Sequence, residues 1–150
     1  MDRGMLGSNV VTQIGIIVRD IEKTSEAYAK VFGIHKPSWS WTDTEDSAHT
    51  KYRGASTPAR AKLAFMRFGS LDIELIEPDE HPSTWREFLD AHGEGVHHIA
   101  FQVERGDERV EALANSGMPA VQTGDYTGGR YMYMDTTSDL KVILELLENR

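Results

Sequence analysis

The spacing of apolar residues divides the chain into short strands and helices. Between Val10 and Arg19, the apolar Ile14, Ile16 and Val18 alternate with other side chains, a period of two that is typical of a β-strand. Apolar positions three and four apart indicate amphipathic helices instead. The two patterns predict strands at 10–19, 61–68, 71–77, 96–103, about 121, 130–134 and 141–147, and helices over about 20–32, 83–91 and 105–116.

Residues at the ends of these segments support the helix predictions. Asp20 and Ser83 are of the types that cap helix N-termini, and Gly33 and Gly117 stand where a residue that closes a helix is expected. Residues 35–60 form a long polar stretch without a clear period. Long segments of this kind are usually functional or disordered.

The second half of the chain repeats the pattern of the first. When Gln13 is placed over His98, an offset of 98 − 13 = 85, the apolar positions of the two strands coincide, and each strand is followed by a helix that ends near a glycine. The closing strands LDIELIE and VILELLE match in the same way, with Glu74 over Glu145. The order of elements therefore predicts two similar modules, at about 10–80 and 95–148, within one α+β domain.

The repeat places four polar side chains together on the inner faces of strands. If the alternating apolar residues pack under the helices, the residues between them face the other way. His97 should then point away from His98, toward the helix side or an interface. Carboxylates among Ile and Leu are costly to bury unless they are paired, protonated or bound to a cation. Two carboxylates beside a histidine suit a hard or borderline divalent metal. The predicted ligands are Gln13, Glu74, His98 and Glu145.

Composition restricts the class of protein. The 150 residues suit one domain, expected over 10–150 after a flexible N-terminal tail at 1–9 that lacks the apolar core of a signal peptide. No apolar run approaches the roughly 18 residues that a membrane helix needs. With no cysteine, thiolate metal sites are excluded and the cytoplasm is the simplest expectation for location. The net charge of −8 argues against a nucleic-acid partner.

With these residues laid out, the chain resembles the vicinal-oxygen-chelate superfamily of glyoxalases, bleomycin-resistance proteins and dioxygenases. The stretches IELIEP at 73–78 and GEGVHHIAF at 93–101 are most similar to its methylmalonyl-CoA epimerase and glyoxalase-I-like branch. The resemblance implies two βαβββ modules that form a cupped mixed sheet around a metal, with the helices outside. It also implies a homodimer and the same four ligands: Gln13, Glu74, His98 and Glu145.

Two positions depart from the epimerase pattern. The first ligand of that branch is His, whereas this chain has Gln13, a weaker and neutral ligand that favours harder ions such as Mn²⁺ or Mg²⁺. The branch also carries a catalytic Glu just before its third strand, where this chain has no carboxylate between Ser56 and Ala61. A second acid or base would then have to come from Glu45 or Asp46 in the preceding loop.

The resemblance implies an isomerase, epimerase or lyase that acts through an enolate or enediolate of a small carbonyl compound or acyl thioester. One divalent ion (Mn, Co, Ni, Mg, Fe or Zn) would act as Lewis acid. Glu145 would move the proton, with Glu74 as the other carboxylate of the site. One His and two carboxylates do not match the two-His, one-carboxylate set of iron oxygenases.

An alternative of another class stays open, a metal-free small-molecule or drug-binding protein of the bleomycin-resistance type. Such a protein would hold its ligand between aromatic side chains. The aromatic residues expected to line the cavity in either case are Trp39, Trp41, Tyr131 and Tyr133.

Overall fold

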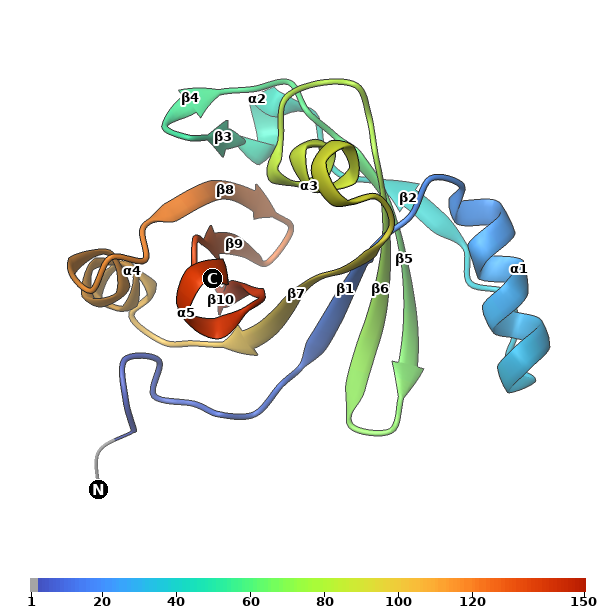
Figure 1. Cartoon of the computed structure of the whole chain (residues 1–150), viewed down its shortest axis with the longest axis horizontal. Coiled ribbons are helices and arrows are strands. Elements are labelled where there is room, and N and C mark those ends of the chain that lie inside the picture. The colour runs from blue at the N-terminus through green and yellow to red at the C-terminus, as the bar shows by residue number, and fades with distance from the viewer. Residues whose placement is uncertain (1–2) are drawn as a thin grey trace.

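The computed structural model describes residues 3–150, which form one curled ten-stranded mixed sheet with helices around it (Figure 1). The strands follow the order β2-β5-β6-β1-β7-β10-β9-β8-β3-β4 across the sheet. In chain order the elements are β1 (Gln13–Ile17), α1 (Ile21–Phe32), β2 (Trp39–Trp41), α2 (Glu45–Ala48), β3 (Lys51–Tyr52), β4 (Ala55–Ser56), β5 (Ala61–Phe68), β6 (Leu71–Pro78), α3 (Thr84–His92), β7 (Gly95–Gln102), α4 (Gly106–Asn115), β8 (Ala120–Tyr126), β9 (Gly129–Met134), α5 (Thr137–Leu140) and β10 (Ile143–Asn149).

The predicted pair of βαβββ modules is confirmed by the sheet order. β1, α1, β2, β5 and β6 form the first module, and β7, α4, β8, β9 and β10 form the second in the same order. Within each module the first strand pairs in parallel with the last, and β1 and β7 join the modules in an antiparallel pair. The first and last strands of both modules therefore lie side by side at the centre of the sheet.

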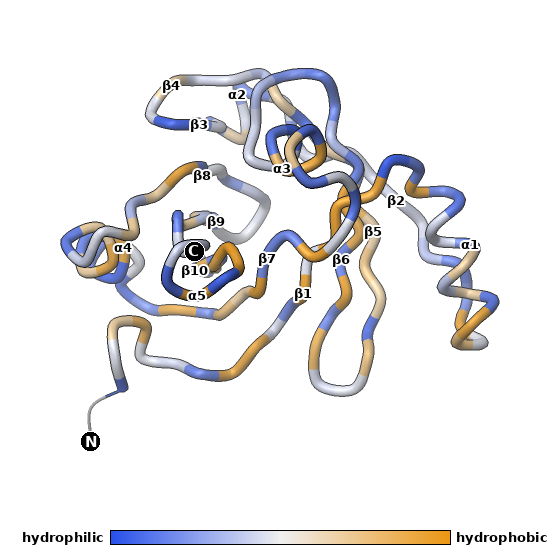
Figure 2. The backbone as a smooth tube through the Cα atoms, in the orientation of Figure 1, coloured by the Kyte–Doolittle hydropathy of each residue, from blue (hydrophilic) through white to orange (hydrophobic). Residues whose placement is uncertain are grey.

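Residues at the helix ends behave as their types predict. The Asp20 side chain accepts from the backbone N–H of Lys23, and Gly33 closes α1 in the left-handed conformation at φ 66°. Ser83 caps α3 in the same way by accepting from the N–H of Arg86. Hydrophobic and hydrophilic positions alternate along α1 and α4 (Figure 2), as expected for helices that cover a sheet on one side.

The apolar core has three parts that follow the two modules and the helix between them. α1 and α4 lie outside the curled sheet at opposite ends of Figure 1, each over the alternate apolar residues of its own module. The third part lies under α3, where Trp85 and Leu89 pack against Ile17, Ile76 and Tyr133. α3 thus ties both modules together at one end of the cup.

Residues 35–60, for which the sequence predicts no regular element, contain four short ones. β2 has three residues and α2 has four, which is too short for a period to show. β3 and β4 form a hairpin whose turn residues, Arg53 and Gly54, both have positive φ, as a two-residue hairpin turn requires. The hairpin pairs with β8 of the second module. The last strand also begins later than predicted, because α5 precedes it.

The expected flexible tail at 1–9 is partly packed. Residues 1–2 lie outside the described residues. Farther along, Leu6 packs against the core cluster under α4, and the Arg109 guanidinium donates to the carbonyl oxygen of Met5 at 3.4 Å. Part of the tail therefore covers the second module.

No helix within residues 3–150 combines the length and the apolar character needed to cross a membrane.

Candidate metal centre

Strand register brings three predicted ligands to one place on the inner face of the sheet. Gly15 in the middle of β1 lies opposite Glu74 of β6 on one side and opposite His98 of β7 on the other. On the far side of β7, Glu145 of β10 lies opposite Ala100. Residues that lie opposite each other share a face, so these side chains project into the same cup.

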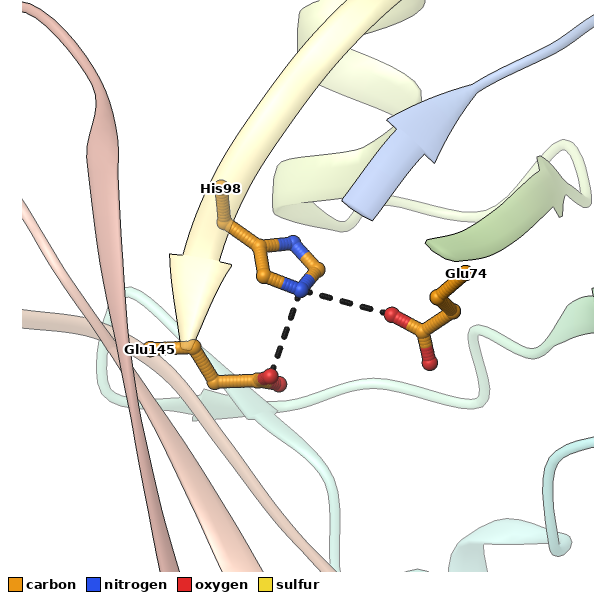
Figure 3. A group of neighbouring side chains, drawn as sticks. All are labelled: Glu74, His98 and Glu145. Carbon is orange, nitrogen blue, oxygen red and sulfur yellow. Dashed lines mark ion pairs between the residues drawn. The ribbon is translucent and has the colours of Figure 1, made fainter. Parts of the chain in front are cut away.

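The three side chains meet at the imidazole of His98 (Figure 3). The Nε2 atom of His98 lies 3.3 Å from Oε1 of Glu74 and 3.2 Å from Oε1 of Glu145. All three residues are buried, with 0% of His98, 6% of Glu74 and 4% of Glu145 exposed. Within the part of the chain that the structure describes, none of these three atoms has a hydrogen-bond partner.

Three converging, buried and unsatisfied ligand atoms fit a divalent metal. Leaving such groups without hydrogen bonds is costly, and a shared cation removes that cost. Donors about 2.1 Å from one ion lie about 3.0 to 3.4 Å apart in octahedral or tetrahedral geometry, and the two distances above fall in this range. The His-and-carboxylate set excludes soft ions that need thiolates.

Burial and the close contacts between the three side chains together set their protonation. Burial lowers the pKa of the His98 imidazole, but the nearby Glu145 and Glu74 outweigh it and raise that pKa to about 10. Burial raises the pKa of the Glu74 carboxyl, which His98 opposes. Without a bound cation, the protonated imidazole carries the positive charge that the carboxylates require.

Gly15 and His97 fix the position of the His98 ring. A Cβ on Gly15 would meet the His98 imidazole at 2.0 to 2.6 Å, so only glycine leaves room for the ring. On the other side, Nδ1 of His98 lies 2.8 Å from Nδ1 of His97, and Nε2 of His97 lies 3.2 Å from Oγ1 of Thr84. Burial lowers the pKa of His97 well below its usual range, so the ring is a neutral partner. His97 contacts Phe88 of α3, which agrees with its predicted orientation.

Gln13, the fourth predicted ligand, is half-buried on β1 and lines the same cavity as Glu74 and Glu145. It shares its face of the sheet with Gly15, and therefore with His98. An amide oxygen from this strand would complete a set of one nitrogen and three oxygen ligands.

Gln13, Glu74 and Glu145 line a cavity of about 490 Å³ inside the cup, and His98 is buried behind the two carboxylates. Of the aromatic residues predicted to line it, Trp41, Tyr131 and Tyr133 do so. Trp39 does not line it, which corrects the prediction for this residue. Its indole N–H donates to Oε1 of Glu22 at 2.7 Å, and its ring packs with the core under α1. Trp39 and Trp41 share one face of β2, so alternation alone could not separate them.

Several residues that line the cavity were not singled out from the sequence. Trp85 reaches it from α3, Phe65 and Leu63 from β5, and Asp43 and Asp125 stand among the lining residues. Neither Glu45 nor Asp46, the acids proposed for the missing epimerase carboxylate, is among them. Asp43 is held near that position because the backbone N–H of its neighbour Thr42 bonds the carbonyl oxygen of Ala61. The repeat gave no signal for these residues, which lie in loops or at positions where the two modules differ.

Tyr131 and Tyr133 stand on β9 beside the ligand atoms. Tyr133 lies opposite Glu145 in the register of β9 with β10, and its ring centroid is 5.0 Å from that of His98. Burial raises the pKa of both tyrosines above the usual range; hydrogen bonds from Gln122 and Thr50 oppose this for Tyr131. Both phenols are therefore neutral over the physiological pH range.

Comparison with known proteins identifies the family. Residues 12–134 match the model of the Glyoxalase/Bleomycin resistance protein/Dioxygenase superfamily, and the chain belongs to this superfamily. An uncharacterized Bacillus subtilis protein, YqjC, is 30% identical over 107 residues, which cover 71% of this chain and 66% of that protein. The chain thus spans slightly less than two thirds of this relative.

Solved structures share the fold. Methylmalonyl-CoA epimerase from Mycobacterium tuberculosis superposes with a TM-score of 0.64 at 21% identity, covering 100% of this chain and 93% of that one. A hypothetical protein from Bacillus halodurans gives 0.63 at 26% identity, covering 95% and 96%. A Streptomyces coelicolor methylmalonyl-CoA epimerase variant in complex with 2-nitronate-propionyl-CoA gives 0.61 at 22%, covering 94% of each chain. These likenesses agree with the cupped arrangement of two modules.

Proposed function

We propose that the chain is a divalent-metal-dependent enzyme that moves a proton next to a carbonyl group, as an isomerase, epimerase or lyase. One observation carries the proposal: the buried atoms of Glu74, His98 and Glu145 converge without hydrogen-bond partners, and the two carboxylates line a cavity. Membership of the superfamily and the likeness to epimerase folds support it.

Glu74, His98 and Glu145 would hold the ion, with Gln13 as a fourth ligand. When bound, the ion supplies a Lewis acid that polarises substrate oxygens and lowers the cost of an enolate or enediolate. Glu145 would accept and return the proton, because its carboxylate lines the cavity and can act as a general base. Leu63 and Phe65 of β5 would exclude water from the opposite wall.

The charge of the cavity bears on the choice of substrate. Four of the described lining residues are acids (Asp43, Glu74, Asp125 and Glu145), and none is Lys, Arg or His. The ion would balance Glu74 and Glu145, and Arg150 lies 3.9 Å from Asp125, which leaves Asp43 as an exposed acid of the lining. This favours a small uncharged carbonyl compound, such as a hemithioacetal, over an acyl-CoA with its phosphates.

The segment before β5 corresponds to the place where the epimerase branch carries its catalytic glutamate. Ala59 and Ala61 are buried there, and no carboxylate occupies the segment from Ser56 to Ala61. Asp43 is the lining acid tied to this region and is the candidate for a second proton-transfer group. Epimerisation of methylmalonyl-CoA would need this exposed side chain to replace the usual glutamate.

A metal-free ligand-binding protein is the second candidate. It is favoured by the aromatic side chains that line the cavity, which are Trp41, Phe65, Trp85, Tyr126, Tyr131 and Tyr133. Stacking on such a surface can hold a planar ligand without an ion.

Metal analysis of the purified protein tests the proposal. We expect about one divalent ion per chain in the wild type, loss of the ion in His98→Ala, and retention in the matched control His35→Ala, whose histidine is exposed. Turnover of hemithioacetals and of methylmalonyl-CoA by the loaded protein then separates the two substrate classes. A wild type that binds no added Mn²⁺, Co²⁺, Ni²⁺ or Zn²⁺ but binds an aromatic ligand tightly would favour the metal-free candidate.

A further inference from the structure

Two tyrosine hydroxyls on the cavity wall each receive a hydrogen bond from a neighbouring side chain. The indole Nε1–H of Trp85 donates to Oη of Tyr133 at 3.0 Å. The amide Nε2 of Gln122 donates to Oη of Tyr131 at 3.1 Å. Both tyrosines line the cavity that contains the predicted ligands. The two phenol oxygens are therefore acceptors toward the protein interior.

The direction of these bonds is set by chemistry. An indole N–H can donate but cannot accept, so Tyr133 has to be the acceptor in its bond with Trp85. The orientation of the Gln122 amide is fixed at its other end, where Oε1 accepts the backbone N–H of Thr84 at 2.8 Å. A backbone N–H also only donates, so the amide oxygen must face Thr84 and the NH₂ group must face Tyr131. Neither phenol proton is consumed by these bonds.

We infer that Tyr131 and Tyr133 are preset hydrogen-bond donors that bind an acceptor oxygen of the ligand beside the metal, with Gln122 and Trp85 as the positioning residues. The ligand class follows from this polarity: the bound group carries a carbonyl, carboxylate, enolate or phenolate oxygen. Placing that oxygen beside an ion rests on the proposed function, whereas the polarity of the two hydroxyls does not.

Both tyrosines stand on the β9 side of the cavity. Tyr133 lies opposite Glu145 in β10, and the position related to it in the first module, opposite Glu74 in β6, is Phe65. By the same register, Leu63 is the counterpart of Tyr131. A ligand is therefore oriented with its oxygen toward β9 and its apolar side toward β5. Donors aimed at an oxygen that gains negative charge stabilise that charge without having to reorganise.

Raman spectroscopy tests the polarity of Tyr131 without metal or ligand. The intensity ratio of the tyrosine doublet is high when the phenol accepts and low when it donates strongly. Difference spectra with and without Tyr131→Phe isolate this residue. Gln122→Glu keeps the oxygen that faces Thr84 and replaces the amide donor by an acceptor, so the Tyr131 proton should turn toward residue 122 and the ratio should fall. An unchanged ratio would overturn the inferred polarity.

Calorimetric binding of acetohydroxamate, which offers two adjacent oxygens, to the Mn²⁺-loaded protein tests the role. We expect binding about tenfold weaker in Tyr131→Phe and in Tyr133→Phe, which is typical of one lost hydrogen bond. Gln122→Glu should weaken binding to a similar extent and add little to Tyr131→Phe in the double variant. The matched control Tyr28→Phe removes a phenol hydroxyl on α1, outside the cavity lining, and should bind within about twofold of wild type.

The outcomes are distinguishable. Wild-type affinity in both tyrosine variants, with thermal unfolding unchanged, would overturn the inference even if Mn²⁺ binds. Failure of the wild type to bind Mn²⁺ would overturn the proposed function, and the Raman ratio would still decide the polarity of Tyr131.

Discussion

The two modules put the same strands around the site but give it different chemistry. On the first and last strands, the first module supplies the neutral Gln13 and the acid Glu74, whereas the second supplies His98 and Glu145. The difference grows on the neighbouring strands, where apolar side chains of β5 face the tyrosines of β9. The repeated strand order sets where the side chains point, and the modules differ in whether those side chains are polar or apolar.

The modules also differ at one small residue. The offset that places Gln13 over His98 places Gly15 over Ala100. His98 lies over Gly15 and leaves no room for a Cβ there, whereas Ala100 carries one. The larger, rigid ligand of the second module therefore requires the smaller residue in the first. This dependence is visible only when both modules are seen together.

The largest expected effect distinguishes a charged ligand from a neutral one. Glu145→Gln keeps the shape but removes the negative charge, and we expect Mn²⁺ affinity to fall more than about 100-fold, with loss of turnover. Gln13→Ala should reduce affinity by only about tenfold, since a neutral amide oxygen is lost. Calorimetric titration of metal-free protein measures both. Equal losses would remove the distinction between the modules.

The next largest effect is on stability, and it compares the β9 wall of the cavity with the β5 wall. Tyr133 is 2% exposed and Phe65 is 47% exposed although they occupy related positions. Tyr133→Leu removes a ring packed against His98 together with the bond from Trp85, and we expect it to lower the free energy of unfolding by about 2 to 3 kcal/mol. Phe65→Leu should cost less than about 1 kcal/mol. Urea unfolding of the two variants measures both losses in unfolding free energy. Similar losses would contradict the effect expected from the difference in burial.

Exchange of the small residues gives a somewhat smaller effect. Gly15→Ala forces the His98 ring to move, and we expect a loss of about 2 kcal/mol in unfolding free energy together with weaker metal binding. Ala100→Gly creates no clash and should cost about 1 to 2 kcal/mol, through backbone entropy and the loss of one buried methyl group, with metal affinity kept. Thermal unfolding and metal titration of both variants provide the measurement. Normal metal affinity in Gly15→Ala would mean that Gly15 does not set the ring position.

The smallest effect is a dependence of metal affinity on pH. The pKa of His98 in the metal-free protein is raised to about 10, so a metal has to displace a proton from the imidazole below that pH. Affinity should therefore rise with pH near neutrality, by up to about tenfold per pH unit for one displaced proton. Titrations of the wild type at constant ionic strength measure the slope. A flat profile in the wild type would contradict the proton shared by His98 and its carboxylates.

The arrangement of strands could be predicted because it depends on periodicity, which the sequence shows twice. Ile16, Val18, Leu75 and Leu146 alternate with the residues that face the cup, and the repeat marks which of these are polar. The residues on the central strands, His98 above all, follow from that alternation. The structure brings Glu74, His98 and Glu145 together. The repeat alone predicts this grouping, independently of any resemblance to a family.

What could not be predicted depends on short elements and on packing between distant segments. β2 is only three residues long, so nothing in its sequence shows that Trp39 turns to Glu22 while Trp41 lines the cavity. The bond from Trp85 to Tyr133 joins α3 to β9 over 48 positions of sequence. Such contacts are set by tertiary structure, which local patterns do not encode.

The most direct test of the central claim is an anomalous difference map from crystals of the protein loaded with Mn²⁺ or Zn²⁺. We expect one strong peak within about 2.0 to 2.3 Å of Oε1 of Glu74, Nε2 of His98 and Oε1 of Glu145. A map with no peak there, or with its only peak at the surface cluster of Asp79, Glu80 and His81, would contradict the proposed metal centre.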